Sequence, residues 1–202
     1  MESAIAIWNI RGLNDPRKQK EVYNIVQSEK LDLIGLTETK VKSYNYDVIH
    51  KNMLPQWSQV SNKDHDHRGR IWLLWNHRNI DVVIEQMTDQ YIHTTIKELG
   101  TKRTYLLTVV YGRNGRPDRV KLWDDLSVIS QSVTTPWTLM GDFNACKDTC
   151  EKIGGNPLHP RETIDFNEFL VNNDLADLSS KGAFYTWSNK SRTNARTLTK
   201  ID

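Results

Sequence analysis

The sequence has few residues that could form disulfides or bind zinc. Its 202 residues include only two cysteines, Cys146 and Cys150. Two thiols are too few for a disulfide framework and fit a reducing compartment. Their C-x3-C spacing has no second Cys or His pair at zinc-finger spacing, so plain thiols are favoured. His65-Asp66-His67 lies in residues 44–67, a polar segment expected to be irregular, and is interpreted as a loop tip rather than a metal site.

Long apolar runs are also absent. No segment approaches the roughly 20 apolar residues of a membrane span. The Met1-Glu2-Ser3 start lacks the charged and apolar regions of a secretory signal, so we expect no membrane partner. The length predicts one domain over residues 1–202 with a sizeable core. No internal repeat or linker divides it.

The chain has almost no surplus of one charge. Lys and Arg number 27 against 25 Asp and Glu, a net charge of +2. The overall charge therefore does not predict a polyanionic partner, and any such partner must be argued from local clusters. Residues 181–201 contain five basic residues and no acid. A solvated tail is the usual interpretation, but basic residues interleaved with Tyr185 and Trp187 also suit phosphate contact and base stacking.

Apolar runs between polar turns predict several strands. Residues 4–8 are apolar on both faces, as expected of a central buried strand. Four later runs are joined by short polar links, so we expect them to be antiparallel neighbours. Another strand is expected at residues 31–36. The four later runs are residues 71–75, 80–84, 91–99 and 105–111.

The predicted helices fall between groups of strands. Asn14 or Asp15 can cap a first helix, and Pro16 suits the first position of that helix. Since strands outnumber helices, the pattern predicts two packed sheets flanked by helices. The further helices are expected from residue 118 and over 163–173, and further short strands over 175–178 and 184–189.

Polar side chains follow the strand predicted before Gly141. A short apolar run meets this glycine, and Asp142 and Asn144 come next at alternate positions. Residues two apart on an extended chain point to the same side, so we expect both side chains to reach into one small volume. An acid and an amide there suit proton transfer and phosphate contact.

Three other strand ends carry Asn9, Glu38 and Tyr111. Taken singly, Asn9 fits a satisfied buried amide as well as a site residue, and Glu38 fits a surface acid slightly better than a site residue. Together they form an oxygen-rich cluster. Glu38 and Asn9 offer the hard oxygen ligands that suit Mg²⁺ and not zinc. Mg²⁺ beside an acid that deprotonates water is a phosphodiester-cleaving arrangement.

Five short motifs follow one another along the chain. They are Trp-Asn-Ile-Arg-Gly-Leu at 8–13, Leu-Thr-Glu-Thr-Lys at 36–40, Val110-Tyr111 with Asn114, Gly-Asp-Phe-Asn at 141–144 and Tyr-Thr-Trp at 185–187. Their order resembles that of the endonuclease/exonuclease/phosphatase superfamily, and the chain is most similar to the endonuclease domain of LINE-type (non-LTR) retrotransposons. Its Asn-Ile-Arg-Gly-Leu-Asn-Asp-Pro start, Glu-Lys-Ile-Gly-Gly at 151–155 and Phe-Tyr-Thr-Trp run resemble plant elements in particular.

The resemblance implies a fold and a role for each site residue. The fold is a four-layered α/β sandwich, in which two mainly antiparallel sheets pack face to face with helices outside. Glu38 is the Mg²⁺ ligand, with Mn²⁺ as the alternative ion, and Asn9 lies beside it. Asp142 orients or deprotonates the attacking water. Asn144 and Tyr111 hold the scissile phosphate and its transition-state charge.

The resemblance also implies DNA contacts. Asn114 and the Thr186-Trp187 segment lie on the DNA-contact side, and Arg113 and Arg116 make the nearby loop basic. Arg11 stands where the apurinic/apyrimidinic endonuclease branch has an acid. Arginine at that position fits the retrotransposon branch and argues against abasic-site repair.

The implied activity is nicking of one DNA strand to leave a 3′-hydroxyl. That end would prime a reverse transcriptase domain of the parent polyprotein, so a nuclear location is expected. The alternative from another class is a non-catalytic DNA-binding remnant. A phosphoesterase acting on small phosphates or lipids shares the fold and is the least favoured.

One motif of the superfamily is not found. The family ends in Ser-Asp-His, which supplies a metal-side Asp and a catalytic His, followed by a final core strand. None of the six histidines follows a Ser-Asp pair, and the sequence stops at Thr199-Lys200-Ile201-Asp202. We therefore expect a domain that is incomplete at its C-terminus, lacks its last core strand and nicks DNA weakly or not at all.

Overall fold

The computed structural model describes residues 3–66, 70–179, 181–193 and 195–201. The chain forms two compact units, each described below on its own. The first unit comprises residues 1–111 and 134–141, and the second comprises residues 112–133 and 142–202. Within the described ranges, no helix is both long and apolar enough to cross a membrane.

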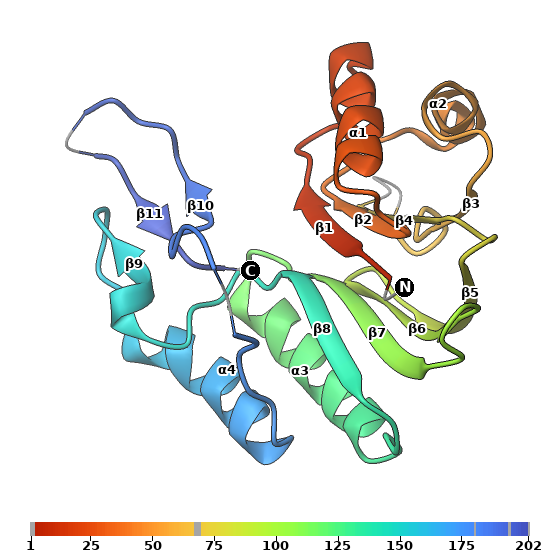
Figure 1. Cartoon of the computed structure of the whole chain (residues 1–202). Helices are drawn as coiled ribbons and strands as arrows, with labels where there is room; N and C mark the ends of the chain where they lie inside the picture. Colours follow the sequence, from red (N-terminus) through yellow and green to blue (C-terminus); the bar gives the residue numbers. More distant parts are fainter. Residues whose placement is uncertain (1–2, 67–69, 180, 194, 202) are drawn as a thin grey trace. The chain divides into compact units, whose positions relative to one another are not determined.

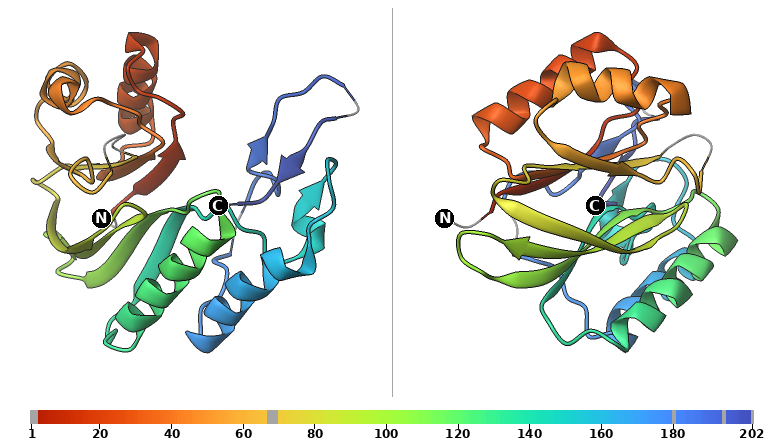
Figure 2. Two further views of the ribbon diagram at one scale, coloured as in Figure 1. Left: turned by 180° about the vertical axis from the view of Figure 1, so that it is seen from behind. Right: turned by 90° about the vertical axis from the view of Figure 1, so that its right-hand side faces the viewer.

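The first unit begins with a four-stranded sheet covered on one face by two helices (Figure 1). β1 and β2 are parallel, and the other pairs are antiparallel. Figure 2 shows α1 and α2 side by side on the same face of this sheet. The sheet order is β1 (Ile5–Asn9), β2 (Leu33–Thr37), β4 (Ile71–Trp75), β3 (Ser58–Ser61), and the helices are α1 (Pro16–Ser28) and α2 (Tyr46–Met53), the latter preceded by the 3-10 turn Ser43–Asn45.

Helix α1 begins where the sequence predicts. The side chain of Asp15 accepts a hydrogen bond from the backbone N–H of Arg17 at 2.9 Å, and Pro16 occupies the first turn. Asp15 is thus the N-cap, which satisfies one of the backbone donors left open at a helix start. Val22 and Val26, one turn apart, are buried against the sheet.

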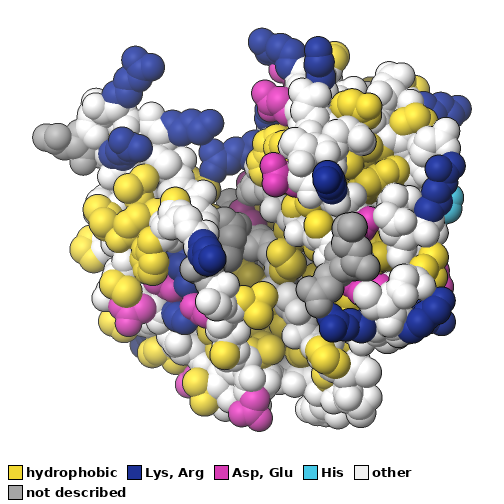
Figure 3. All heavy atoms as spheres, in the orientation of Figure 1, with side chains coloured by type: hydrophobic (Ala, Val, Ile, Leu, Met, Phe, Trp, Pro, Cys, Tyr) yellow, Lys and Arg dark blue, Asp and Glu magenta, His cyan; other side chains and the backbone are white. Residues whose placement is uncertain are grey.

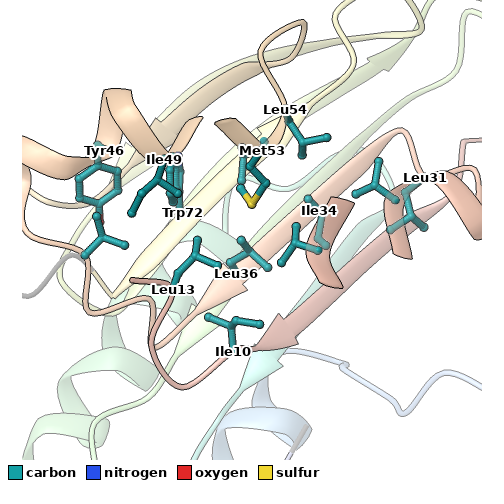
Figure 4. Packing of buried hydrophobic residues seen from close by; sticks show 14 residues of the cluster. Ile10, Leu13, Leu31, Ile34, Leu36, Tyr46, Ile49, Met53, Leu54 and Trp72 are labelled. Atoms are coloured by element: carbon teal, nitrogen blue, oxygen red, sulfur yellow. The ribbon is translucent and has the colours of Figure 1, made fainter. Parts of the chain in front are cut away.

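The core between these helices and the sheet is built around Trp72 (Figure 4). Trp72 is fully buried, and its ring meets the edge of Tyr46 from α2 at a centroid distance of 4.7 Å. Ile49 and Met53 extend the same face of α2 into this core. Their spacing of three and seven residues from Tyr46 is helical, so α2 forms because it buries one apolar stripe.

The second sheet of the first unit packs against the inner face of the first sheet. One apolar cluster contains Leu33 and Leu73 from the first sheet together with Ile92 and Val109 from the second, so the two sheets face each other. The first three strands form an antiparallel meander. The order is β5 (Ile80–Met87), β6 (Tyr91–Glu98), β7 (Thr104–Tyr111), β8 (Trp137–Asp142), of which Asp142 belongs to the second unit. The predicted pair of mainly antiparallel sheets is confirmed.

Two predictions for this unit are wrong. The strand at 71–75 does not neighbour the strand at 80–84, because it pairs with β2 and β3 in the other sheet. Residues 44–67 are not an irregular loop, because they contain α2 and β3. In both cases burial against distant residues decides the structure. In the predicted His65-Asp66-His67 loop tip, His67 lies outside the described residues.

The second unit contains two helices, α3 and α4, packed through aromatic rings. Trp123 stacks on Phe169 at a centroid distance of 5.1 Å and lies 4.9 Å from Phe166, which neighbours Phe143 at 5.5 Å. A small sheet, in the order β10-β11-β9, completes the unit. Its elements are α3 (Arg116–Ser130), the 3-10 turn Thr149–Glu151, β9 (Lys152–Ile153), α4 (Pro160–Asn172), β10 (Trp187–Ser188) and β11 (Leu198–Thr199).

Two short strands differ from their predictions in the second unit. Residues 175–178 form no strand, and the aromatic strand predicted over 184–189 is reduced to the two residues of β10. The exposed side chains of Leu178 and Phe184 show why, because neither segment buries a continuous apolar face. The helices predicted from residue 118 and over 163–173 are confirmed as α3 and α4.

His93 makes the stability of the first unit sensitive to acid. Its Nδ1 lies 2.8 Å from Thr108 Oγ1, which also accepts a hydrogen bond from the indole N–H of Trp137. Burial lowers the pKa of His93 below its ordinary value of 6.5, against a weaker opposing effect of Glu85. The unfolded chain therefore binds a proton at His93 at a higher pH than the folded chain does. The contribution of neutral His93 to the free energy of unfolding is fully present above pH 6.5 and is lost as the pH falls below that value.

We expect the free energy of unfolding to decrease between about pH 7.5 and about pH 5.5. Chemical denaturation at the two pH values measures this decrease. In the variant His93→Gln, which keeps a polar group but does not titrate, the decrease should be smaller. An identical decrease in both proteins would contradict the assignment to His93.

Candidate active site

The loops that follow β1 and β2 continue the parallel pairing of those strands. The N–H of Ile10 donates to Thr37 O at 3.1 Å, and the N–H of Gly12 donates to Glu38 O at 2.7 Å. This ladder brings Asn9 and Glu38 together, because the carboxyl ends of parallel strands lie at the same edge. Asn9 Nδ2 donates to Glu38 Oε1 at 3.1 Å. Of the predicted site residues, these two are in direct contact.

The carboxylate of Glu38 is held ionised by its neighbours. Its other oxygen, Oε2, lies 3.2 Å from Lys40 Nζ. Partial burial alone would raise the pKa of Glu38, but the hydrogen bond from Asn9 and the ion pair with Lys40 outweigh it, with help from Arg11. The pKa of Glu38 therefore lies below its ordinary value of 4.5. A carboxylate with that property remains a ligand for cations throughout the neutral range.

Three of the eight described non-glycine residues with positive φ lie in these same loops. Arg11, Glu38 and Lys40 all adopt the left-handed conformation, with φ of 51°, 52° and 52°. Asn144 in the second unit does so too, with φ of 48°. This conformation costs residues other than glycine about 1–2 kcal/mol of conformational energy. Residues in strained conformations are often found at functional sites. Nothing in the sequence pattern of these residues indicates this conformation.

Tyr111, at the end of β7, is the third predicted site residue in the first unit. It is buried, and its backbone N–H donates to Gln90 O at 2.8 Å. Its hydroxyl accepts a hydrogen bond from Arg70 Nη1 at 3.0 Å. Arg70 also donates from Nε to the buried carboxylate of Asp66 at 3.0 Å. The sequence does not indicate Arg70, because its position depends on the pairing of β2 with β4.

The first unit offers oxygen ligands that suit a hard cation. Among the described residues no three His, Cys, Asp or Glu side chains form a metal cluster. Mg²⁺ is commonly held by one or two protein oxygens, with water and substrate phosphate completing its shell. The Asn9 and Glu38 pair meets that requirement. Thr37 pairs with Asn9 across the two strands, and its hydroxyl is fully buried. This hydroxyl has no hydrogen-bond partner in the described part of the chain, so the strand end holds one more polar group that a ligand could satisfy.

Asp142 and Asn144 lie in the second unit and are joined by a tight turn. Asp142 is buried, and its Oδ1 accepts a hydrogen bond from the backbone N–H of Asn144 at 3.0 Å. Asn144 Nδ2 donates to Gly112 O at 2.7 Å. The prediction that strand alternation brings these two side chains together is wrong. The strand ends at Asp142 and Asn144 is left-handed, so a turn and not strand alternation brings them together.

The loop before α3 carries the predicted DNA-contact residues Arg113 and Asn114, and Arg116 is the first residue of α3. Asn114 is exposed, and its carbonyl accepts a hydrogen bond from Arg119 Nη1 at 2.6 Å. The same nitrogen donates to the carbonyl of Arg113 at 2.9 Å, so Arg119 fixes the shape of this loop. Arg116 makes two hydrogen bonds to Asp165, at 2.6 and 2.8 Å, and its charge is balanced there.

The remaining predicted DNA-contact residues are divided between the units. Arg11 is exposed in the first unit. Thr186 is exposed in the second unit, and its backbone N–H donates to Thr199 O at 3.1 Å. Trp187 is half-buried and pairs with Thr199 across β10 and β11.

The hairpin between β10 and β11 presents basic side chains. Lys190, Arg192 and Arg196 are all exposed, and Figure 3 shows basic side chains gathered over this hairpin. Asn189 holds its loop, because Oδ1 accepts hydrogen bonds from the N–H groups of Ser191 and Thr197, both at 3.1 Å. Described residues of the hairpin are thus held by hydrogen bonds, while its basic side chains are exposed to solvent.

Comparison with known proteins identifies one family. The model of the family described as Endonuclease/Exonuclease/phosphatase family matches residues 6–199. A search of curated protein sequences found no match.

Solved structures share the fold at low sequence identity. The endonuclease domain of TRAS1, a telomere-specific non-LTR retrotransposon, has a TM-score of 0.73 and 12% identity, over 99% of this chain and 83% of that chain. D. rerio TDP2, complexed with a single-strand DNA product, has a TM-score of 0.57 and 13% identity, over 98% and 84%. A family protein from Bacteroides thetaiotaomicron has a TM-score of 0.54 and 16% identity; the matched region covers 71% of this chain and 64%, less than two thirds, of that one. At these identities the likeness shows the fold alone.

Proposed function

The chain belongs to the endonuclease/exonuclease/phosphatase family, and from that premise we propose that it is a Mg²⁺-dependent DNA endonuclease. Its reaction is hydrolysis of one phosphodiester bond, which nicks one strand. The observation that carries the proposal is the hydrogen-bonded pair of Asn9 and Glu38 at the ends of two parallel strands. A carboxylate kept ionised beside an amide is a suitable ligand set for a hard divalent cation.

Glu38 and Asn9 hold the divalent cation in this proposal, Mg²⁺ first and Mn²⁺ as the alternative. When bound, such a cation stabilises the negative charge that develops on the phosphate during hydrolysis. Lys40 is the ion-pair partner of Glu38 at 3.2 Å in the structure. Its ammonium balances the charge of the carboxylate, which would be available to a divalent cation as a ligand.

Asp142 is assigned to the attacking water as its proton acceptor. The carboxylate is buried and is oriented by the N–H of Asn144. One N–H of the Asn144 side chain donates to Gly112 O, and we assign the other to a phosphate oxygen. The hydroxyl of Tyr111 is the second phosphate contact. These donors stabilise the charge of the transition state.

The DNA contacts are assigned to polar, basic and aromatic side chains, most of which are exposed. The β10–β11 hairpin contributes Lys190, Arg192 and Arg196 to the phosphates. The residues predicted from the sequence are retained, namely Arg11, Arg113, Asn114, Arg116, Thr186 and Trp187. For Arg116 a contact requires exchange of its Asp165 partner.

The biological role proposed is that of a retrotransposon endonuclease. The chain is inferred to come from a LINE-type element similar to those of plants, and its nick leaves a 3′-hydroxyl that primes a reverse transcriptase domain of the same polyprotein. The similarity to the TRAS1 endonuclease domain supports this proposal. Cleavage of chromosomal DNA implies a nuclear location.

A plasmid assay tests the proposal. Because none of the six histidines follows a Ser-Asp pair, we expect Mg²⁺ to convert supercoiled plasmid only slowly to the open circular form, which one nick per molecule produces. EDTA should abolish the conversion, and added Mg²⁺ or Mn²⁺ should restore it. Relaxation that persists in EDTA would contradict a metal-dependent mechanism.

The second candidate is a DNA-binding protein that does not cleave. The structured basic hairpin favours it, because binding to phosphates needs no Glu38. A gel shift whose affinity decreases steeply with salt and persists in Glu38→Ala, without nicking at any metal concentration, is the result expected of this candidate.

A further inference from the structure

Arg70 connects the two parts of the proposed site in the first unit. Its carbonyl accepts a hydrogen bond from the N–H of Thr39 at 3.3 Å, which fixes Arg70 beside the loop that carries Glu38. Its Nη1 donates to Tyr111 Oη at 3.0 Å. One residue thus contacts both the metal-side loop and the phenol assigned to the phosphate.

The direction of the contact with Tyr111 follows from chemistry. A guanidinium has only donors, so the phenol oxygen must be the acceptor. The guanidinium carbon also lies 5.1 Å from the centre of the Tyr111 ring, within the range of a cation–π contact. The orientation of the hydroxyl is therefore set by Arg70, and a fixed positive charge lies beside it.

Arg70 is itself held in place by buried groups. Asp66, with a side chain only 3% exposed, accepts a hydrogen bond from Nε at 3.0 Å. Asn62 is fully buried and accepts hydrogen bonds from residues on both sides of Arg70. Its Oδ1 accepts from Ile71 N at 2.9 Å, and its backbone carbonyl accepts from Asp66 N at 2.9 Å. Its Nδ2 ties the loop to the β5–β6 turn at Thr88 O, 3.0 Å away. Such an arrangement keeps a functional side chain in one geometry.

We propose that Arg70 is a positioning residue, which holds the hydroxyl of Tyr111 in the orientation that contacts the scissile phosphate. This inference rests on the proposed function. The competing explanation is that Arg70 only stabilises its own loop through Asp66. The two differ in one respect, because only the positioning role makes the effect of Arg70 depend on the hydroxyl of Tyr111.

A double-mutant cycle with Arg70→Met and Tyr111→Phe separates the two explanations. We expect Arg70→Met to lower kcat for plasmid nicking by about 10- to 100-fold with little change in KM. In the Tyr111→Phe background the same change should cost less than about 3-fold. Arg70→Lys keeps the charge but not both hydrogen bonds, so its kcat should lie between the two. The matched control is Arg17→Met, which removes an exposed arginine paired with Asp15 and should leave kcat unchanged.

A spectroscopic measurement decides the inference without relying on activity. In protein labelled with 3-fluorotyrosine, the Tyr111 resonance is assigned by its loss in Tyr111→Phe. We expect Arg70→Met to move this resonance and Arg17→Met to leave it in place. If the wild-type protein does not nick DNA, the proposed function fails and this resonance alone decides the positioning role. An unmoved resonance, or equal losses of kcat from Arg70→Met in both backgrounds, would overturn the inference.

Discussion

Replacing Glu38 by glutamine is expected to lower the rate of Mg²⁺-dependent nicking by about 100-fold or more. The amide has the shape of the carboxylate but no charge. It therefore loses both the attraction for a divalent cation and the ion pair with Lys40 Nζ at 3.2 Å. The hydrogen bond from Asn9 Nδ2 can still form to the remaining side-chain oxygen. The folded structure should be retained, so the loss should appear in catalysis and not in the unfolding transition.

Steady-state nicking over a series of Mg²⁺ concentrations measures this effect. Higher concentrations should recover part of the activity of Glu38→Gln, because its defect is weakened binding of the cation. Glu21→Gln is the matched control, since Glu21 is exposed on α1 and the same chemical change there should leave nicking unaffected. A Glu38→Gln variant with the wild-type rate and Mg²⁺ dependence would show that Glu38 is not the metal ligand.

The Asn9 and Glu38 pair could be predicted from the sequence because it depends on local signals. Asn9 ends one short apolar run and Glu38 lies just past the next, so both could be placed at strand ends. The structure shows that the two strands are parallel, and parallel strands bring their carboxyl ends to one edge. Local signals also predicted the first helix with Asn14 or Asp15 as its cap, and the structure shows that the cap is Asp15.

Arg70 could not be predicted in this way. It is near Tyr111 only because β4 pairs with β2, which sets Ile71 opposite Thr37 across a separation of more than thirty residues. Short links between the apolar runs at 71–75, 80–84, 91–99 and 105–111 favoured a single meander. The strand at 71–75 instead lies in the sheet under α2, where Trp72 is buried against Tyr46. Pairing of distant strands is settled by packing of the whole unit, which a local pattern does not contain.

Asn144 shows a second limit, because its local structure differs from the one that the sequence pattern predicts. Alternation along a strand predicted that Asp142 and Asn144 share one side. The structure instead places Asn144 at φ of 48°, with its N–H on Asp142 Oδ1 at 3.0 Å. Asn tolerates this conformation better than most residues, which gives a physical reason for Asn at this position. A pattern of apolar and polar residues carries no information on φ.

Gly141→Ala is expected to destabilise the protein by about 3 kcal/mol or more. Two effects add at this position. Gly141 has φ of 141°, which side chains other than glycine rarely adopt, and a Cβ would overlap the carbonyl oxygen of Val110 on β7. That oxygen belongs to backbone, which cannot rotate away as a side chain can. Equilibrium denaturation should show the loss as a lower midpoint with the same slope.

Two further glycine variants separate the two effects. Gly12→Ala introduces a side chain at φ of 98° with nothing within 4 Å of its Cβ, so it measures backbone strain alone, about 1–2 kcal/mol. Gly100→Ala has neither effect and should be neutral or slightly stabilising. If Gly141→Ala costs no more than Gly12→Ala, the close approach of Val110 is not what requires glycine there. If it costs more, the close approach of β8 to β7 explains the glycine before Asp142.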